Sequence, residues 1–190
     1  MKMHYRILSY LIIVFVAIGC SPQLSFDELT KDLPSKLGTR SYSSTKMGYS
    51  ISLLDQFVLR DNNYNDTLKL ELFIDTSMVF EEGASTLTII KFNSTETTLE
   101  KSWRKFISDR MLIEDFQVYS EGLTDYLLEP AYYEHSAYTM SKKNTESINF
   151  LIRGDSSSFY FMNLEVIMED DYPNNLKELL SCVKTVKLLP

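Results

Sequence analysis

Residues 131–168 read AYYEHSAYTM SKKNTESINF LIRGDSSSFY FMNLEVIM. This stretch contains three runs that are rich in aromatic and β-branched residues: Ala131–Met140, Ser147–Arg153 and Phe159–Met168. Such runs are typical of β-strands, and the connections between them are short enough for hairpins. We therefore expect three strands, each of which pairs antiparallel with its neighbour in the sequence.

Further strands are expected upstream, where apolar and polar residues alternate. The alternation is clear over Tyr49–Leu53 and over Leu68–Ile74, and a period of two places every second side chain on the same face of a strand. An irregular segment is expected between these two strands. Leu87–Phe92 and Phe116–Tyr119 are expected to be strands as well.

Two amphipathic helices complete the expected elements. The first follows a capping-box pattern at residues 97–100, and the last begins near Pro173, because proline suits the first turn of a helix. Apolar residues recur at helical spacing in both: Leu99, Trp103, Phe106, Ile107 and Met111 in the first, and Leu176, Leu179, Leu180 and Val183 in the last. Trp103 should therefore be buried between the helix and the sheet. Few, unevenly placed helices among many strands indicate an α+β domain in which helices cover an antiparallel sheet.

The order of these elements resembles that of the PsbP/Mog1-like family. The resemblance rests on short signatures at matching places in the element order: Gly48–Leu53, Ser120–Gly122, Pro130–Tyr133 and Leu179–Val183. The family includes an extrinsic photosystem II subunit, a nuclear-transport factor that binds a small GTPase, and many bacterial lipoproteins. The resemblance implies an αβα sandwich around an antiparallel sheet.

The N-terminal residues have the pattern of a secretory signal. A basic start precedes an apolar run over residues 7–19, which is too short for a membrane-spanning helix. The run leads into AIGC at residues 17–20, which resembles a lipobox, the motif whose cysteine is acylated after the preceding bond is cleaved. We therefore expect cleavage between Gly19 and Cys20 and a lipid anchor on Cys20. The alternative is an ordinary signal peptide that has a cysteine near its end.

The expected organisation has three parts: a lipoprotein signal peptide at residues 1–19, the lipidated cysteine and a polar tether at residues 20–45, and a single α+β domain at residues 46–190. A short helix is expected within the tether at Phe26–Lys31, because Ser25 and Glu28 form a second capping box. By resemblance to lipoprotein sorting rules, Ser21 favours the outer membrane of a bacterial envelope, on its periplasmic face.

Charge and cysteine content narrow the possible partners. The 190-residue chain has a net charge of −7, and an acidic domain is repelled by nucleic acid, so no nucleic-acid partner is expected. The cysteines are Cys20 and Cys182, and acylation of the first leaves no partner for an intramolecular disulfide. Cys182 is expected to be a buried, unreactive thiol.

No catalytic residue, metal site or cofactor motif is expected. His135 lacks the second ligand of a zinc motif and is expected to be a hydrogen-bonded or solvent-facing strand residue, with Glu134 on the opposite face. Ser156–Ser158 lack the G-x-S-x-G context of a nucleophile. Glu169–Asp171 offers carboxylates to a divalent cation, but an acidic run before a helix is better explained by the helix dipole.

Aromatic residues crowd the second half of the chain. Tyr132, Tyr133, Tyr138 and Tyr160 are candidates for an exposed interaction surface, because tyrosine is enriched in protein interfaces. We therefore expect a non-catalytic envelope lipoprotein that docks a protein partner. A domain that binds a small molecule or a divalent ion is the alternative, and a hydrolase without a recognisable motif is a third possibility. Convergent polar groups in a pocket would favour the small molecule.

Overall fold

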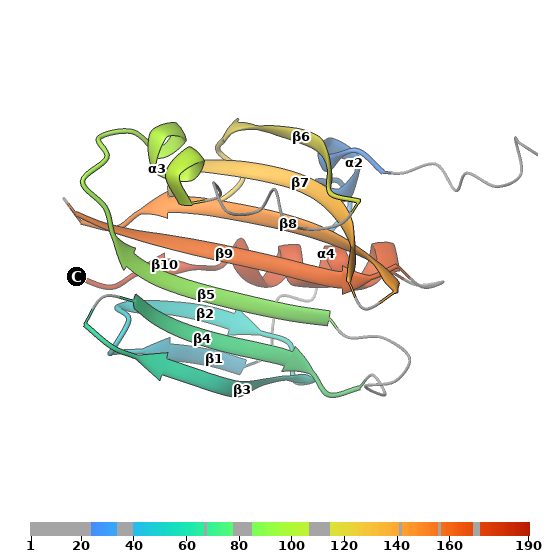
Figure 1. Cartoon of the computed structure of the whole chain (residues 1–190). Coiled ribbons are helices and arrows are strands. Elements are labelled where there is room, and N and C mark those ends of the chain that lie inside the picture. Colours follow the sequence, from blue (N-terminus) through green and yellow to red (C-terminus); the bar gives the residue numbers. More distant parts are fainter. Residues whose placement is uncertain are drawn as a thin grey trace, which may run out of the picture.

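Two antiparallel sheets and three helices make up the described part of the chain (Figure 1). The computed structural model describes residues 24–33, 40–66, 68–77, 85–106, 115–140, 142–155, 157–168 and 172–190. Several residues of the sequence analysis lie outside these ranges: Gly19, Cys20, Ile107, Met111, Ser156 and Glu169–Asp171.

The larger sheet has seven strands in the order β3-β4-β5-β9-β8-β7-β6. Its strands are β3 (Phe57–Tyr64), β4 (Leu68–Asp75), β5 (Ser85–Asn93), β6 (Gln117–Thr124), β7 (Ala131–Met140), β8 (Lys143–Arg153) and β9 (Ser158–Ile167). Strands β7, β8 and β9 pair antiparallel in chain order, which confirms the hairpins expected from the short connections. Strand β9 also pairs antiparallel with β5, so the C-terminal hairpins join the N-terminal strands in one sheet.

The smaller sheet has the order β1-β2-β10. It consists of β1 (Arg40–Ser44), β2 (Tyr49–Leu53) and β10 (Lys187–Leu188). Strand β2 is expected from its alternation, whereas β1 lies in the expected tether and β3 in the expected irregular segment. Strands β1 and β3 are largely exposed. The two-residue β10 was not expected either, and all three missed strands lie at sheet edges. An edge strand buries few side chains, so its sequence need not alternate.

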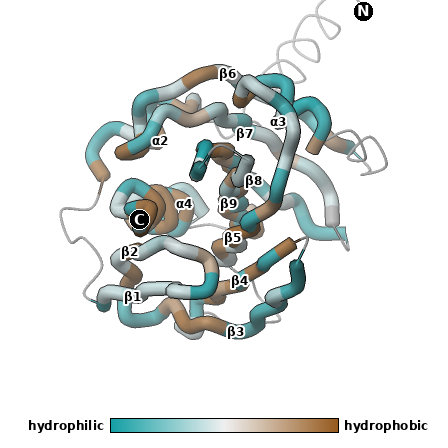
Figure 2. Tube along the Cα trace, turned by 90° about the vertical axis from the view of Figure 1, so that its left-hand side faces the viewer, coloured by the Kyte–Doolittle hydropathy of each residue, from teal (hydrophilic) through white to brown (hydrophobic). Residues whose placement is uncertain are grey.

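Helices cover both faces of the larger sheet. Figure 2 shows α2 (Phe26–Thr30) and α4 (Tyr172–Val183) on one side of β5, β9 and β8, and α3 (Leu99–Phe106) on the other side. This arrangement confirms the α+β class and the αβα sandwich. The smaller sheet adds a further layer beside α4, which contacts β2. Among the described helices, none is long and apolar enough to cross a membrane.

Trp103, a residue of α3, is fully buried, as expected. The centroid of its ring lies 5.6 Å from the ring centroid of Tyr132 and 5.8 Å from that of Phe161. Leu151 and Phe159 complete this cluster. On the opposite face, the expected apolar positions of α4 are buried in the main core. The two apolar helix faces read from the sequence therefore mark the two sides of the sheet.

Part of the expected tether belongs to the folded domain. The capping box of Ser25 and Glu28 forms at the start of α2, and the next turn buries Phe26 and Leu29 in the main core. The Phe26 ring stacks on Tyr133 with a centroid distance of 4.2 Å. Strand β1 pairs with β2 along its whole length. The expected polar tether therefore does not extend over residues 24–33 or 40–44.

A buried carboxylate joins the two sheets. Glu71 of β4 is fully buried, and its Oε1 accepts hydrogen bonds from Ser44 Oγ at 2.6 Å and from Tyr42 OH at 3.1 Å. Tyr64 OH also donates to Oε1, and Tyr49 OH donates to Oε2. Burial, together with the adjacent carboxylate, raises the pKa of Tyr49, so its hydroxyl remains a donor. Four hydroxyl donors thus compensate a carboxylate that is removed from water.

Candidate functional site

The four tyrosines expected to form an interaction surface do not form one. Tyr132, Tyr138 and Tyr160 are buried, and Tyr133 is half-buried under α2. The hydroxyl of Tyr160 donates to the carbonyl of Met47 at 2.6 Å. The expectation is wrong because both faces of the larger sheet are covered, whereas alternation in a sequence shows only which residues share a face.

His135 and Glu146 form a buried pair across β7 and β8. His135 Nε2 lies 2.6 Å from Glu146 Oε1, and both side chains are buried. Glu134 interacts on the opposite face with Ser136 and Asn149, as expected from the alternation. A catalytic relay needs a nucleophile hydrogen-bonded to the other ring nitrogen, and among the described residues His135 Nδ1 has no hydrogen-bond partner. The sequence did not indicate Glu146, because it comes from the neighbouring strand.

Cys182 is fully buried in α4, as expected, and its thiol is free. Burial raises the pKa of this thiol to about 11, so the thiolate that reacts in redox exchange is scarce at neutral pH. Within the described ranges, no group of three or more His, Cys, Asp or Glu side chains is placed so that it could hold a metal ion.

Exposed apolar side chains lie on β6, an edge strand of the larger sheet. Leu123 is 74% exposed and Val118 is 44% exposed. They are opposite Tyr132 and Ser136 of β7, which are four residues apart, so Leu123 and Val118 lie on the same face of the sheet. Leu128, in the loop after β6, is 59% exposed. Exposed apolar side chains that share one face of an edge strand are a candidate interaction site.

The surroundings of β6 are acidic. No lysine or arginine occurs from residue 111 to residue 141. Among the described residues of this segment, four acidic side chains are exposed: Asp115, Glu121, Asp125 and Glu129. Arg104 of α3, whose pKa is raised mainly by Glu100 and further by Glu121, forms an ion pair with Glu100 at 3.0 Å. The β6 edge therefore combines apolar side chains with an excess of negative charge.

The opposite edge of the same sheet is different. Strand β3 exposes a polar and charged run over residues 60–63, and its pairing with β4 is interrupted by a bulge between Leu59 and Asp61. Charges and bulges are the usual protection of an edge strand against pairing with another chain. Strand β6 also has an irregularity, between Val118 and Ser120, but pairs regularly with β7 from Ser120 to Thr124.

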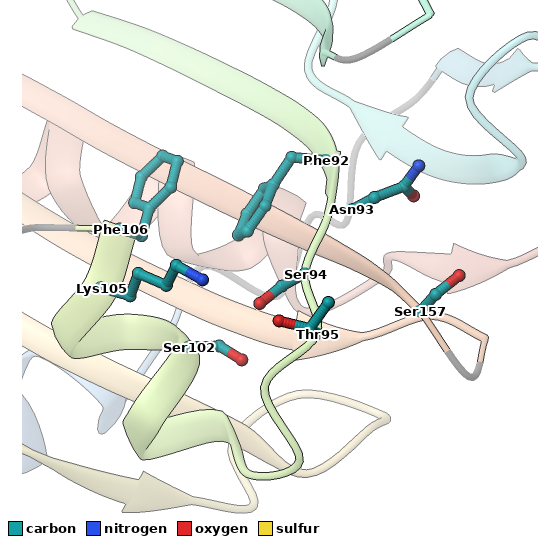
Figure 3. Close-up of a pocket in the computed structure, with 8 residues that line it drawn as sticks. All are labelled: Phe92, Asn93, Ser94, Thr95, Ser102, Lys105, Phe106 and Ser157. Carbon is teal, nitrogen blue, oxygen red and sulfur yellow. The ribbon is translucent and has the colours of Figure 1, made fainter.

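A pocket of about 530 Å³ lies between the end of β5, α3 and the β8–β9 loop. Its lining residues are Phe92, Asn93, Ser94, Thr95, Ser102, Lys105, Phe106 and Ser157. Figure 3 shows the hydroxyl groups of Ser94, Thr95 and Ser102 and the ammonium group of Lys105 turned toward the space between α3 and the segment that precedes it. The rings of Phe92 and Phe106 form an adjacent wall. No sequence motif marks this site, because its polar residues come from separate segments.

No protein-family model and no curated protein matches the chain. Solved structures do match its fold. The Ran-binding protein Mog1p of Saccharomyces cerevisiae is 11% identical with a TM-score of 0.54, over 81% of this chain and 97% of its own. Cyanobacterial PsbP (CyanoP) of Synechocystis is 10% identical with a TM-score of 0.55, over 88% and 98%.

Two further matches come from bacteria. LpqN, a protein involved in cell envelope biogenesis of Mycobacterium tuberculosis, is 9% identical with a TM-score of 0.54, over 90% of this chain and 100% of its own. A structure from Bacteroides thetaiotaomicron is 12% identical with a TM-score of 0.55, over 82% of this chain and 50% of its own, so this chain spans about half of that protein. At such identities the likeness concerns the fold alone, and together with the helix-covered antiparallel sheet it shows that the chain has the fold of PsbP and Mog1.

Proposed function

We propose that this protein is a membrane-anchored lipoprotein of the bacterial cell envelope, and that its domain binds a protein partner without catalysis. The signal-like N-terminus that ends in Cys20 supports the anchor. The fold is shared with an envelope-biogenesis protein and with a Ran-binding protein, which supports an accessory role. The observation that carries the binding function is the exposed apolar and acidic edge of β6.

The chemistry of this edge selects the kind of partner. An edge strand presents unpaired backbone groups, so an extended segment can add to the sheet by main-chain hydrogen bonds. The exposed Leu123 and Val118 favour apolar side chains in that segment. The exposed carboxylates around β6 favour positive charge on the partner. The partner segment is therefore an extended strand in which apolar and basic residues alternate.

The anchor is tested by the substitution Cys20→Ala. Without the thiol no acyl chain can be attached, so the variant should be lost almost completely from the membrane fraction, because stable anchoring depends on the acyl chains. Mass spectrometry of the unaltered protein should find residues 1–19 removed and a diacylglyceryl group on Cys20. As a matched control, Cys182→Ala should remain membrane-bound. Full retention of the Cys20→Ala variant would contradict the anchor.

The docking edge is tested with two peptides on the full chain in detergent micelles. An alternating Lys–Val nonapeptide should bind, more weakly as salt is raised, and an alternating Glu–Val nonapeptide should not. Fluorescence anisotropy gives the affinities. Binding should also slow the exchange of backbone amides over Ser120–Thr124, because these amides would join a strand ladder.

Leu123→Arg should weaken binding of the Lys–Val peptide roughly tenfold, since a central apolar contact is replaced by a like charge. Leu189→Arg is the control, because Leu189 is also exposed but follows β10 in the other sheet, and it should leave the affinity unchanged. Equal binding of both peptides, or an equal effect of the two substitutions, would argue against docking at β6.

A further inference from the structure

We infer that the pocket between α3 and the end of β5 binds a small molecule in which a carboxylate or phosphate group is joined to an aromatic or other apolar group. This function is separate from docking at β6. The volume of about 530 Å³ falls within the range of small-molecule sites.

The polar lining of the pocket favours an oxyanion. The hydroxyls of Ser94, Thr95 and Ser102 and the ammonium of Lys105 converge from two sides (Figure 3), and each of these groups can donate a hydrogen bond. Among the described residues that line the pocket there is no aspartate or glutamate, although the chain as a whole has a net charge of −7. A site that offers donors and one positive charge recognises a group with several acceptor oxygens.

Lys105 lies near the carboxylate of Glu96. The two groups are 3.5 Å apart, and the side chains are 64% and 30% exposed. Ion pairs at such an exposed surface contribute little to stability and reorganise readily. The pair with Glu96 can therefore give way to an oxyanion in the pocket.

Ser102 is the second, independent indication of a bound group. Its side chain is 1% exposed, and within the described residues its hydroxyl has no hydrogen-bond partner. A buried hydroxyl without a partner is unfavourable, and such groups in native structures call for an explanation. Because Ser102 lines the pocket, an oxygen atom of a bound molecule would provide the missing partner.

The wall formed by Phe92 and Phe106 would contact the apolar part of the bound small molecule. The two rings are stacked, with centroids 4.8 Å apart and planes at 18°, and both side chains are partly exposed. A stacked pair presents a rigid apolar surface on which an aromatic or aliphatic group can pack. The same cavity therefore offers donors for an oxyanion and an apolar surface for the rest of the ligand.

The inference is tested by titrating the full chain in detergent micelles with phenyl phosphate, phenylacetate, inorganic phosphate and benzyl alcohol. Backbone amide resonances of residues 94–98 and 102–105 should shift with phenyl phosphate, phenylacetate or both, and calorimetry gives the affinities. Comparison of the two acids tells which oxyanion the pocket prefers. Inorganic phosphate and neutral benzyl alcohol should bind at least roughly tenfold more weakly, because each lacks one half of the recognised structure.

Two substitutions separate a binding role from a structural one. Lys105→Met should weaken the bound acid roughly tenfold, whereas Lys101→Met, an exposed lysine on the same helix that does not line the pocket, should have no effect. Ser102→Ala should weaken binding severalfold and leave the melting temperature unchanged or higher, because it removes an unpaired buried hydroxyl. Absence of binding by both aromatic acids, equal binding of benzyl alcohol, or an equal loss in Lys101→Met would overturn the inference.

Discussion

Deletion of residues 1–44 is expected to abolish cooperative folding, whereas deletion of residues 1–22 is expected to leave it intact. The longer deletion removes Phe26 and Leu29 from the main core, and truncation of one such side chain in a core typically costs about 2–5 kcal/mol. It also removes β1, and with it the pairing of β1 with β2. Together these losses approach the whole stability of a small domain, which is about 5–15 kcal/mol.

Circular dichroism during thermal and urea unfolding of the two truncated chains measures this difference. The chain that begins at residue 23 should unfold in one sharp transition that every probe follows, which is the mark of a two-state domain. The chain that begins at residue 45 should have a broad transition or none. Equal midpoints in the two chains would mean that α2 and β1 contribute nothing to stability, against the burial of Phe26 and Leu29 and the pairing of β1 with β2.

Substitution of Glu71 by alanine is expected to lower the free energy of unfolding by about 3–5 kcal/mol, the cost typical of breaking a buried charged network. The carboxylate accepts hydrogen bonds from hydroxyls of both sheets, and the side chain is fully buried. Its removal leaves Ser44 and Tyr49 with buried hydroxyls that lose their partner. The smaller sheet would then lose its buried polar connection to the larger one, although the hydrogen bond from Arg40 of β1 to the Phe57 carbonyl of β3 would remain.

Tyr64→Phe is the matched control for this substitution. It removes one of the four donors to Glu71, from a side chain that is only partly buried, and should cost about 0.5–1.5 kcal/mol, as the loss of a single hydrogen bond does. Both values follow from urea unfolding monitored by the fluorescence of Trp103, which is buried in the native state. A loss below about 1 kcal/mol in Glu71→Ala would mean that the carboxylate does not join the sheets.

Strong periodicity made the central elements predictable. The hairpins β7-β8-β9 have short connections and dense runs of strand-forming residues, and α4 has its apolar residues on one face. In such segments the local pattern and the tertiary environment agree, because the side chains that alternate are the ones that become buried. The edge strands β1 and β3 were missed for the opposite reason, since their stability comes from backbone pairing with a neighbour.

Sites were far less predictable than strands. Glu71 occurs in a clean alternating run and reads as a solvent-facing residue, yet β1 and β2 cover it and supply three of its donors. The pocket residues Ser94 and Lys105 come from different elements and form no motif. A group of polar side chains becomes a site only when separate segments meet, and that depends on sheet order, which a single sequence does not specify.

The residues alone determine the α+β class, the helix faces around Trp103 and Leu179, and the place of His135 on a strand with Glu134 on the opposite face, because each rests on local periodicity. The packing of α2, α3 and α4 decides which parts of the sheet are covered. It therefore decides that Tyr132 and Tyr160 are buried whereas Leu123 is exposed. Such contacts join residues far apart in the chain. The periodicity of a strand assigns its residues to two faces, and only the packing of distant elements determines which face meets water.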